Sequence, residues 1–177
     1  RVESLYMFPM SFVEFLIAKG ENHLVEELEQ HSPTEEFLEA IHKKSLSVLG
    51  EYLFVGGLPE AVSKWISTGN IRETARVHQT LVDTYQQDFS KYISKSQLKH
   101  LRLLFDRIPL LAGKKFKYTS ISDNLRKREI EPCLDALVTA GVAHKIFHSS
   151  AQALPIGAQA NPELFKTILL DVALSQT

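Results

Sequence analysis

The stretch Tyr52-Leu-Phe-Val-Gly-Gly-Leu-Pro-Glu-Ala-Val62 decides how this chain folds. An apolar, helix-forming run ends at the pair Gly56-Gly57, and glycine readily takes the positive φ angle with which many helices end. Pro59 then suits the first turn of a new helix, because proline lacks the N–H group that would be unpaired there. We therefore predict two helices joined by a corner at the two glycines.

The corner also separates two regions of opposite charge. Residues 1–60 carry a net charge of −7, and residues 61–177 carry a net charge of +6. Residues 95–128 alone contain ten Lys and Arg residues and only two acidic ones. Such a local field predicts an anionic partner for the second region and does not bear on the fold.

Composition indicates a globular protein of a reducing compartment. With 177 residues, of which 44% are hydrophobic, the chain can bury a core as one domain or as two small ones. Its single cysteine excludes an internal disulfide. No apolar run has the length of a transmembrane helix, and the N-terminus is unlike a signal peptide. We expect a cytoplasmic protein without a membrane partner.

Helix signals recur through the first two thirds of the chain. Two capping boxes, Ser11 to Glu14 and Ser32 to Glu35, predict helix starts, the second with Pro33 at its first position. Further helices are expected over 59–68, from 70 to about 93 and from 96 to about 109. In the longest of these, apolar positions alternate four and three residues apart, which predicts a buried seam. The seam comprises Ile71, Ala75, His78, Val82, Tyr85, Phe89 and Tyr92.

From Lys114 onward the pattern is that of a winged helix-turn-helix. Residues 116–118 favour a short strand, and Ser120 to Asp123 caps a short helix that ends near 125. A longer helix is expected from about Ile130, because Pro132 belongs in a first turn. After Gly141, strands over 142–147 and 166–171 are expected to form a hairpin. We therefore predict a mainly α protein: a helical bundle over 17–110, then a winged helix-turn-helix with a small β-hairpin over 111–177.

Five stretches together resemble the uncharacterised C-terminal domain that follows the ATPase core in a large group of prokaryotic AAA-type ATPases. They occur in the family's order over nearly the whole chain: Phe8-Pro-Met-Ser-Phe-Val-Glu-Phe15, Gly56-Gly-Leu-Pro-Glu-Ala-Val62, Tyr85-Gln-Gln-Asp-Phe-Ser-Lys-Tyr92, Leu137-Val-Thr-Ala-Gly-Val142 and Asn161-Pro-Glu-Leu-Phe-Lys-Thr-Ile-Leu-Leu-Asp171. The resemblance implies that residues 1–16 are the tail of a preceding ATPase core. It also places Arg1 at the position of an arginine that senses a neighbour's nucleotide.

The resemblance further implies that the family's chemistry lies outside this stretch of chain. The ATPase core of the family binds ATP and magnesium, and no Gly-x-x-x-x-Gly-Lys-Ser/Thr loop occurs here. The nuclease-like segment with which the family often ends would begin after Thr177. We therefore expect a fragment that is a non-catalytic regulatory or connector module without a cofactor of its own. Its expected partners are its own ATPase core, nucleic acid and further copies of itself.

The basic residues of the C-terminal region are the best candidates for a binding site. In a helix-turn-helix, phosphate contacts fall around the groove-facing helix. The cations expected there are Lys114, Lys115, Lys117, Arg126, Lys127, Arg128 and Lys145. The helix face itself carries Glu129, Glu131 and Asp135, which argues against reading of bases and favours weak binding to the backbone. The alternatives are a solvated loop with surface charge and a stand-alone module for protein contacts.

The other polar residues fit structural roles better than chemical ones. Asp88 is better explained as an acceptor that pairs with a Lys or a helix end than as a catalytic acid. His78 on the seam is expected to be a hydrogen-bonded core residue. His144 and His148 lie four apart on a strand, about 13 Å, too far to share a metal ion. Cys133 is expected to be inert packing, and no catalytic motif stands out.

Overall fold

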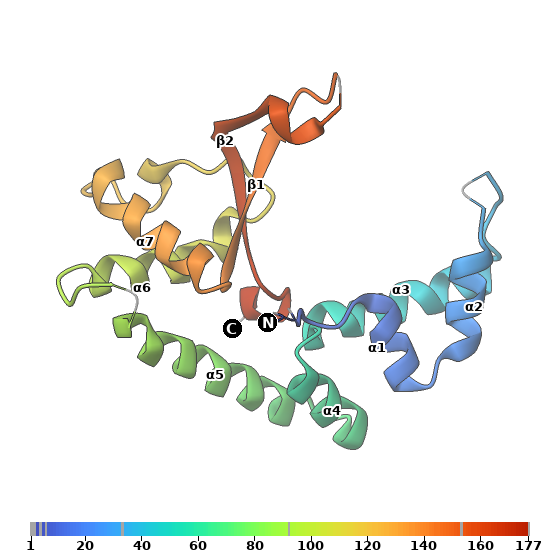
Figure 1. Ribbon diagram of the computed structural model, residues 1–177. Helices are drawn as coiled ribbons and strands as arrows, with labels where there is room; N and C mark the ends of the chain where they lie inside the picture. Colours follow the sequence, from blue (N-terminus) through green and yellow to red (C-terminus); the bar gives the residue numbers. More distant parts are fainter. Residues whose placement is uncertain are drawn as a thin grey trace. The chain divides into compact units, whose positions relative to one another are not determined.

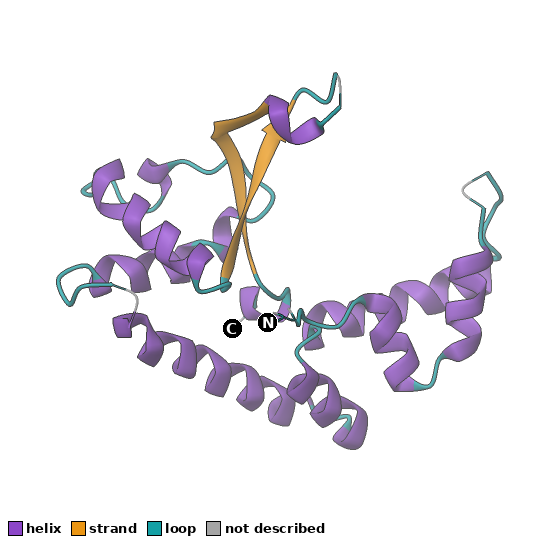
Figure 2. Cartoon of the chain, in the orientation of Figure 1, coloured by secondary structure: helices purple, strands orange, loops and turns teal. Residues whose placement is uncertain are grey.

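The computed structural model describes residues 3, 5, 7–32, 34–91, 93–152 and 154–176. Within these residues, seven α-helices precede a two-stranded antiparallel sheet near the C-terminus (Figures 1 and 2). The predicted fold class, mainly α with a C-terminal hairpin, is confirmed. Two compact units form: unit 1 comprises residues 1–81 and 171–177, and unit 2 comprises residues 82–170. Unit 2 is thus inserted into the sequence of unit 1, whereas the domain limits 1–16, 17–110 and 111–177 stay a prediction.

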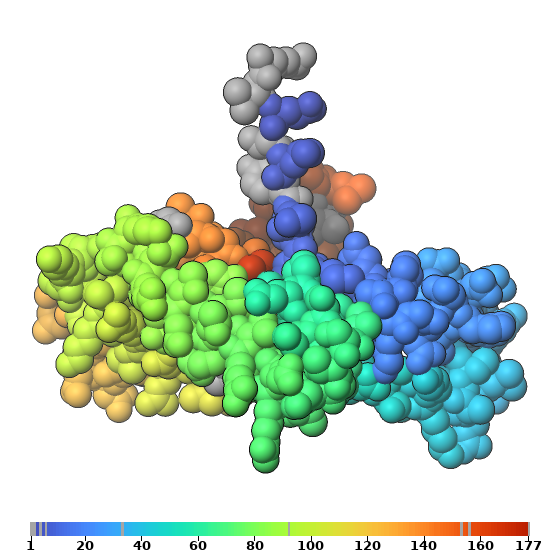
Figure 3. Space-filling model, turned by 90° about the horizontal axis from the view of Figure 1, so that it is seen from below, coloured from blue at the N-terminus to red at the C-terminus, as the bar shows by residue number. Residues whose placement is uncertain are grey.

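Unit 1 is a set of short helices around one apolar core. Ser11 and Glu14 form the predicted capping box: the Glu14 N–H donates to the Ser11 hydroxyl (3.3 Å), and the Ser11 N–H donates to the Glu14 carboxylate (2.7 Å). The described residues 3, 5, 7 and 8 ahead of this box are exposed (Figure 3, blue). The core centres on Phe15, Leu16 and Val55. The helices are α1 (Phe12–Lys19), α2 (Asn22–Gln30), α3 (Glu39–Val55), α4 (Pro59–Thr68) and α5 (Ile71–Asp88), whose second part belongs to unit 2.

The second predicted capping box does not start a helix, and this expectation was wrong. Helix α3 begins only at Glu39. In place of a helix start, the Glu35 N–H donates to the Ser32 carbonyl (3.0 Å). The Ser32 hydroxyl is engaged with Thr34 at 2.8 Å, so local side-chain bonding replaces the helix cap. Pro33 lies outside the described residues.

The corner at Gly56-Gly57 is confirmed, and close packing explains it as much as backbone freedom does. Gly56 has φ 73°. A Cβ on Gly57 would lie 2.1 Å from the Met10 carbonyl oxygen, and the Met10 N–H donates to the Gly57 carbonyl (2.7 Å). From the C-terminal segment of unit 1, the buried Asp171 carboxylate accepts the N–H groups of Gly57 (2.7 Å) and Ala173 (2.9 Å). The corner therefore joins three segments of unit 1.

The predicted seam of α5 is correct in its middle and wrong at its start. His78 is buried, and its Nε2 lies 2.9 Å from the Val55 carbonyl oxygen, as expected of a satisfied core residue. Ile71, however, is 58% exposed, and Ala75 is exposed as well. In this half of the helix the buried side chains include Thr74 and Val77, because the packed face is rotated by one residue. The helix ends at Asp88 rather than near residue 93, and Tyr92 lies outside the described residues.

In unit 2, helix α6 packs on α7, and α7 packs on strand β1 of the hairpin. Leu101, Leu104 and Leu134 are buried where α6 contacts α7. The chain then turns at Gly141 (φ 72°) into the hairpin, and the Leu170 N–H donates to the Val142 carbonyl (2.9 Å). The elements are α6 (Leu98–Arg107), α7 (Lys127–Thr139), β1 (Ala143–Ser149) and β2 (Ala160–Leu169), with short 3₁₀ turns between them.

The helix-turn-helix part of unit 2 differs from the prediction in two places. The expected helix over 120–125 is replaced by a 3₁₀ turn over Tyr118–Ser120, and the Ser122 hydroxyl accepts the Asn124 N–H (3.2 Å) in competition with helix formation. Helix α7 begins at Lys127, three residues early, because Glu129 accepts the Arg126 N–H (2.8 Å). Pro132 consequently lies inside the helix, where its missing N–H leaves one helical hydrogen bond unmade.

The hairpin carries a large irregularity. Phe147 of β1 pairs with Phe165, but the next residue, His148, pairs with Asn161, so residues 162–164 of β2 have no partner in β1. Pro162 lacks an N–H group, and the Glu163 N–H donates to the Asn161 side chain (2.9 Å) instead of to a strand. None of the helices in the described part of the chain is both long and apolar enough to cross a membrane.

Candidate binding site

The predicted basic residues lie in two exposed segments of unit 2. Lys114, Lys115 and Lys117 occupy the loop before the 3₁₀ turn at Tyr118, and all three are exposed. Between them, Phe116 is buried: its ring stacks on Phe165 (centroids 5.2 Å apart), and its N–H donates to the Phe165 carbonyl (2.8 Å). This hydrogen bond is what remains of the predicted strand at 116–118. It fixes the loop against β2 and leaves the lysines facing solvent.

The second segment is the start of α7. Its cations differ in whether an acidic residue of the chain pairs with them. Lys127 Nζ lies 3.5 Å from both Glu131 and Glu163, and 5.5 Å from the centre of the Tyr118 ring. Its pKa is raised by the charge of Glu131 and then by that of Glu163. Much of its charge is therefore balanced within the chain, whereas Arg126 and Arg128 are exposed and form no ion pair within the described residues.

Lys145 is likewise held by an acidic neighbour. Its Nζ lies 2.6 Å from Asp135 of α7 and 5.5 Å from the centre of the Phe165 ring, and its side chain is only 18% exposed. A buried stem with a paired ammonium group fits a structural link between α7 and β1. Five of the seven predicted cations thus remain without an ion pair in the described structure: Lys114, Lys115, Lys117, Arg126 and Arg128.

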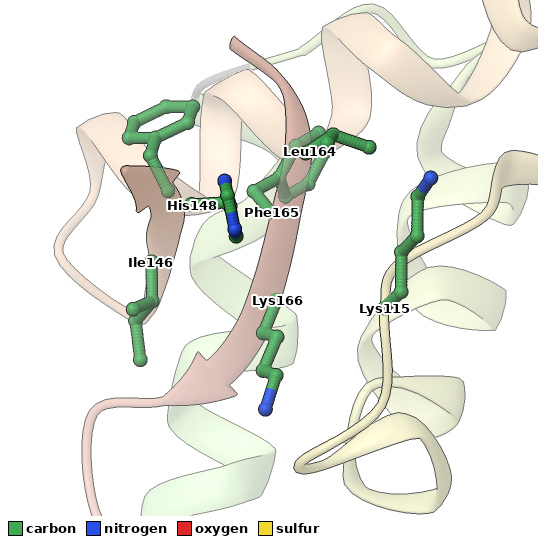
Figure 4. A pocket seen from close by; sticks show the side chains of 7 residues that line it. Lys115, Ile146, His148, Leu164, Phe165 and Lys166 are labelled. Carbon is green, nitrogen blue, oxygen red and sulfur yellow. The ribbon is translucent and has the colours of Figure 1, made fainter. Parts of the chain in front are cut away.

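A pocket of about 320 Å³ opens on the hairpin beside this loop (Figure 4). It lies where the irregularity separates the two strands, since its walls include the residues on either side of the register change. Bulges of this kind turn side chains out of the regular alternation of a strand. The lining residues are Lys115, Ile146, Phe147, His148, Leu164, Phe165 and Lys166.

The hairpin pocket combines an apolar floor with cationic margins. Ile146 and Phe147 are 49% and 45% exposed, so two adjacent large apolar side chains of β1 are accessible to solvent. Lys115 extends from its loop and Lys166 from β2, and Leu164 extends from β2 toward the side of Lys115 (Figure 4). No acidic residue lines the pocket. Its chemistry suits an apolar group that carries negative charge.

The sequence pattern had not indicated this pocket. Leu164, Phe165 and Lys166 fall within one quoted stretch, but the irregularity that exposes the pocket depends on pairing with β1. The one available signal was Asn161-Pro162, because an Asn-Pro pair inside a strand favours a break in its hydrogen bonding. Lys166, exposed and without an ion pair in the described residues, was also missed as a member of the basic surface.

The remaining predicted residues have structural roles or lie outside the description. Asp88 pairs with Lys91 at 2.6 Å, as expected of an ion-paired acceptor. Cys133 is buried, and burial raises the pKa of its thiol to about 11. Among the described residues, no three His, Cys, Asp or Glu side chains lie close enough together to hold a metal ion. Arg1, the predicted nucleotide sensor, lies outside the described residues.

The fold is that of a mainly helical protein with a small antiparallel hairpin near the C-terminus, in which a 3₁₀ turn at Tyr118–Ser120 takes the place of the helix expected between α6 and α7. Residues 47–177, from within α3 to the C-terminus, match the family described as Domain of unknown function (DUF8612), and the chain belongs to this family. Searches among curated proteins and among solved structures returned no match. The prediction of an uncharacterised domain is thereby confirmed, and its link to AAA-type ATPases stays a proposal.

Proposed function

We propose that this chain is a non-catalytic connector module of an AAA-type ATPase, and that its winged-helix unit binds the phosphate backbone of nucleic acid. The ATPase context rests on the resemblance of the five stretches. Two of them meet in unit 1, where Asp171 accepts the Gly57 N–H. Because unit 2 is inserted between residues 81 and 171, unit 1 holds both chain ends that lead into it. Two backbone connections between the units would suit a role in which unit 1 transmits motion to unit 2.

The observation that carries the nucleic-acid proposal is the set of five exposed cations without an ion pair. Three lie on the loop before Tyr118 and two at the start of α7, the two segments that border the groove-facing helix of a winged helix. Unit 2 as a whole has thirteen Lys and Arg against eight Asp and Glu. The paired acids Glu131 and Asp135 on α7 leave its exposed face unsuited to reading bases. Binding is therefore expected to depend on phosphates alone.

Salt dependence gives this proposal a quantitative test. If all five cations contact phosphates, the binding constant for duplex DNA falls with a slope of about −4.5 in log salt, which is roughly 500-fold between about 50 and 200 mM. Replacing Lys114, Lys117 and Arg128 by alanine leaves two contacts and reduces this fall to about 12-fold. The measurement is fluorescence anisotropy of a labelled duplex titrated with the chain.

A matched control removes three cations from unit 1 instead. The variant with Lys43, Lys64 and Arg72 replaced by alanine changes the net charge by the same amount, and its binding should keep the salt slope of the unmodified chain. Equal slopes for both triple variants would refute a phosphate site on unit 2. Absence of binding at the lower salt concentration would refute nucleic-acid binding altogether.

Protein contact is the second candidate function, and two observations favour it. The hairpin pocket exposes Ile146 and Phe147 to solvent. The tip of the hairpin, residues 149–162, contains no Lys or Arg, so it has no cationic side chain with which to contact a phosphate backbone. This candidate predicts that the triple variant of unit 2 binds duplex DNA no differently from the control.

A further inference from the structure

The hairpin pocket has the composition of a docking site for an apolar side chain that is flanked by carboxylates. Its apolar residues come from both strands, and Lys115 and Lys166 stand at its margins (Figure 4). No ion pair within the described residues engages either lysine. Its volume of about 320 Å³ lies near the lower end of the range for ligand pockets, roughly 300–1,000 Å³. It therefore suits one or two side chains of an approaching polypeptide.

A segment with the complementary composition lies in unit 1, in the turn before α3. Leu38 is 71% exposed, and Glu35 and Glu36 are exposed without an ion pair in the described residues. Phe37 packs on His31 with ring centroids 3.9 Å apart, and the Glu35 N–H donates to the Ser32 carbonyl. These contacts hold the turn and leave its leucine and carboxylates facing solvent. We call residues 35–38 the acidic turn.

We infer that the hairpin pocket binds the acidic turn of a second copy of this chain, with Leu38 in the pocket and the carboxylates of Glu35 and Glu36 beside Lys115 and Lys166. Unit 1 carries thirteen Asp and Glu against seven Lys and Arg, whereas unit 2 has the opposite excess. Opposite fields of this kind steer the two surfaces together and disfavour contact between like units. The inference goes beyond the proposed function, because it concerns a partner that is not nucleic acid.

This contact is heterologous, since it joins different surfaces of the two copies. In a pair of copies, one keeps a free acidic turn and the other keeps a free pocket, so association adds further copies as concentration rises unless a ring closes. One buried leucine and two exposed ion pairs make a small interface, which is typical of a transient contact. Weak, salt-sensitive self-association of the full chain is therefore the expected behaviour.

Sedimentation equilibrium of the full chain over a wide concentration range, at low and at high salt, tests the inference. Leu38→Ser should weaken self-association about tenfold, because it removes the apolar anchor. Lys166→Glu and Glu36→Lys should each weaken it, and the double variant that carries both substitutions should regain association, since every pocket and turn then has reversed charges that attract again. Leu154→Ser and Lys99→Glu alter an exposed leucine and an exposed lysine outside the pocket and should have no effect.

Several outcomes would overturn this proposal. A monomer at all concentrations would do so, as would association that Leu38→Ser leaves unchanged or that the double charge-reversed variant does not regain. Duplex DNA binding separates this test from that of the proposed function, because Leu38→Ser should leave DNA binding intact. Loss of DNA binding in Leu38→Ser, with unchanged self-association, would assign the acidic turn to nucleic-acid binding and refute the second-copy contact. Trp65 emission of each variant checks that unit 1 is folded.

Discussion

Replacing Gly56 by alanine tests whether the corner depends on its close contact with Asp171. Gly56 has φ 73° and ψ −169°, a combination that is essentially restricted to glycine. An added Cβ would lie 2.0 Å from Asp171 Oδ1 and 2.8 Å from the Ala173 Cβ. Alanine therefore displaces the carboxylate that accepts the N–H groups of Gly57 and Ala173.

The expected loss of stability follows from these two effects. Holding a side-chain-bearing residue in this backbone region costs roughly 1–3 kcal/mol. A hydrogen bond from a buried N–H group to a charged acceptor contributes about 1.5–3 kcal/mol. With only one of the two Asp171 bonds lost, Gly56→Ala should lower the free energy of unfolding of unit 1 by about 2.5–6 kcal/mol. That is a large part of the stability of an ordinary domain.

Urea unfolding monitored by tryptophan fluorescence measures this loss in unit 1 alone, because Trp65 in α4 is the only tryptophan. Gly50→Ala is the matched control. Gly50 lies inside α3 with no atom near its would-be Cβ, so alanine should stabilise the helix by about 0.5–1 kcal/mol. Alanine at these two glycines, six residues apart, is thus expected to change the free energy of unfolding in opposite directions.

The partner variant Asp171→Ala completes a double-mutant cycle. Since Gly56→Ala and Asp171→Ala disrupt the same contact, the double variant should lose clearly less stability than the sum of the single losses. Additive losses would show that the two residues act independently. A Gly56→Ala variant within about 0.5 kcal/mol of the unmodified chain would refute the close-contact explanation of the corner.

Four further predictions concern local features of the two units and the activity of the whole chain. Ser11→Ala should cost about 1 kcal/mol in urea unfolding of unit 1, because the α1 cap is lost. Hydrogen bonding to the Ser11 backbone lowers the pKa of Glu14, so the ionised carboxylate stabilises unit 1 above the usual Glu pKa, and this stabilisation is lost as the pH falls through the folded value. Glu14→Gln should therefore reduce the fall of the melting temperature at acid pH. Burial raises the pKa of Cys133 to about 11, so a thiol reagent near neutral pH should label it only as fast as unit 2 opens, and immediate labelling would contradict this. Residues 1–177 alone should not hydrolyse ATP, and turnover in a coupled assay would contradict the connector proposal.

Local signals account for the features that the sequence predicted correctly. The capping box at Ser11, the end of the helix over 59–68 and the turn at Gly141 each depend on a few neighbouring residues. Local signals failed where two of them competed. Ser32 and Ser122 have hydroxyls that bond within a turn instead of capping a helix, and neither choice can be read from spacing alone.

The division of the basic residues was decided by contacts between distant segments. Lys127 meets Glu163 of β2, and Lys145 meets Asp135 of α7, so two of the seven predicted cations are already paired. Composition shows the excess of positive charge but not which charges are balanced. When the two paired lysines are excluded, the candidate phosphate-binding residues lie only on the loop before Tyr118 and at the start of α7.

Sequence alone determined the helical class, the acidic and basic regions, the corner and the hairpin, because each follows from the periodicity or backbone preference of adjacent residues. The tertiary structure decided why the corner needs glycine and where a partner can bind. Asp171 reaches Gly57 across more than a hundred residues, and the hairpin pocket exists because His148 pairs with Asn161 directly after Phe147 pairs with Phe165. Both depend on the pairing of distant segments, which local preference does not encode.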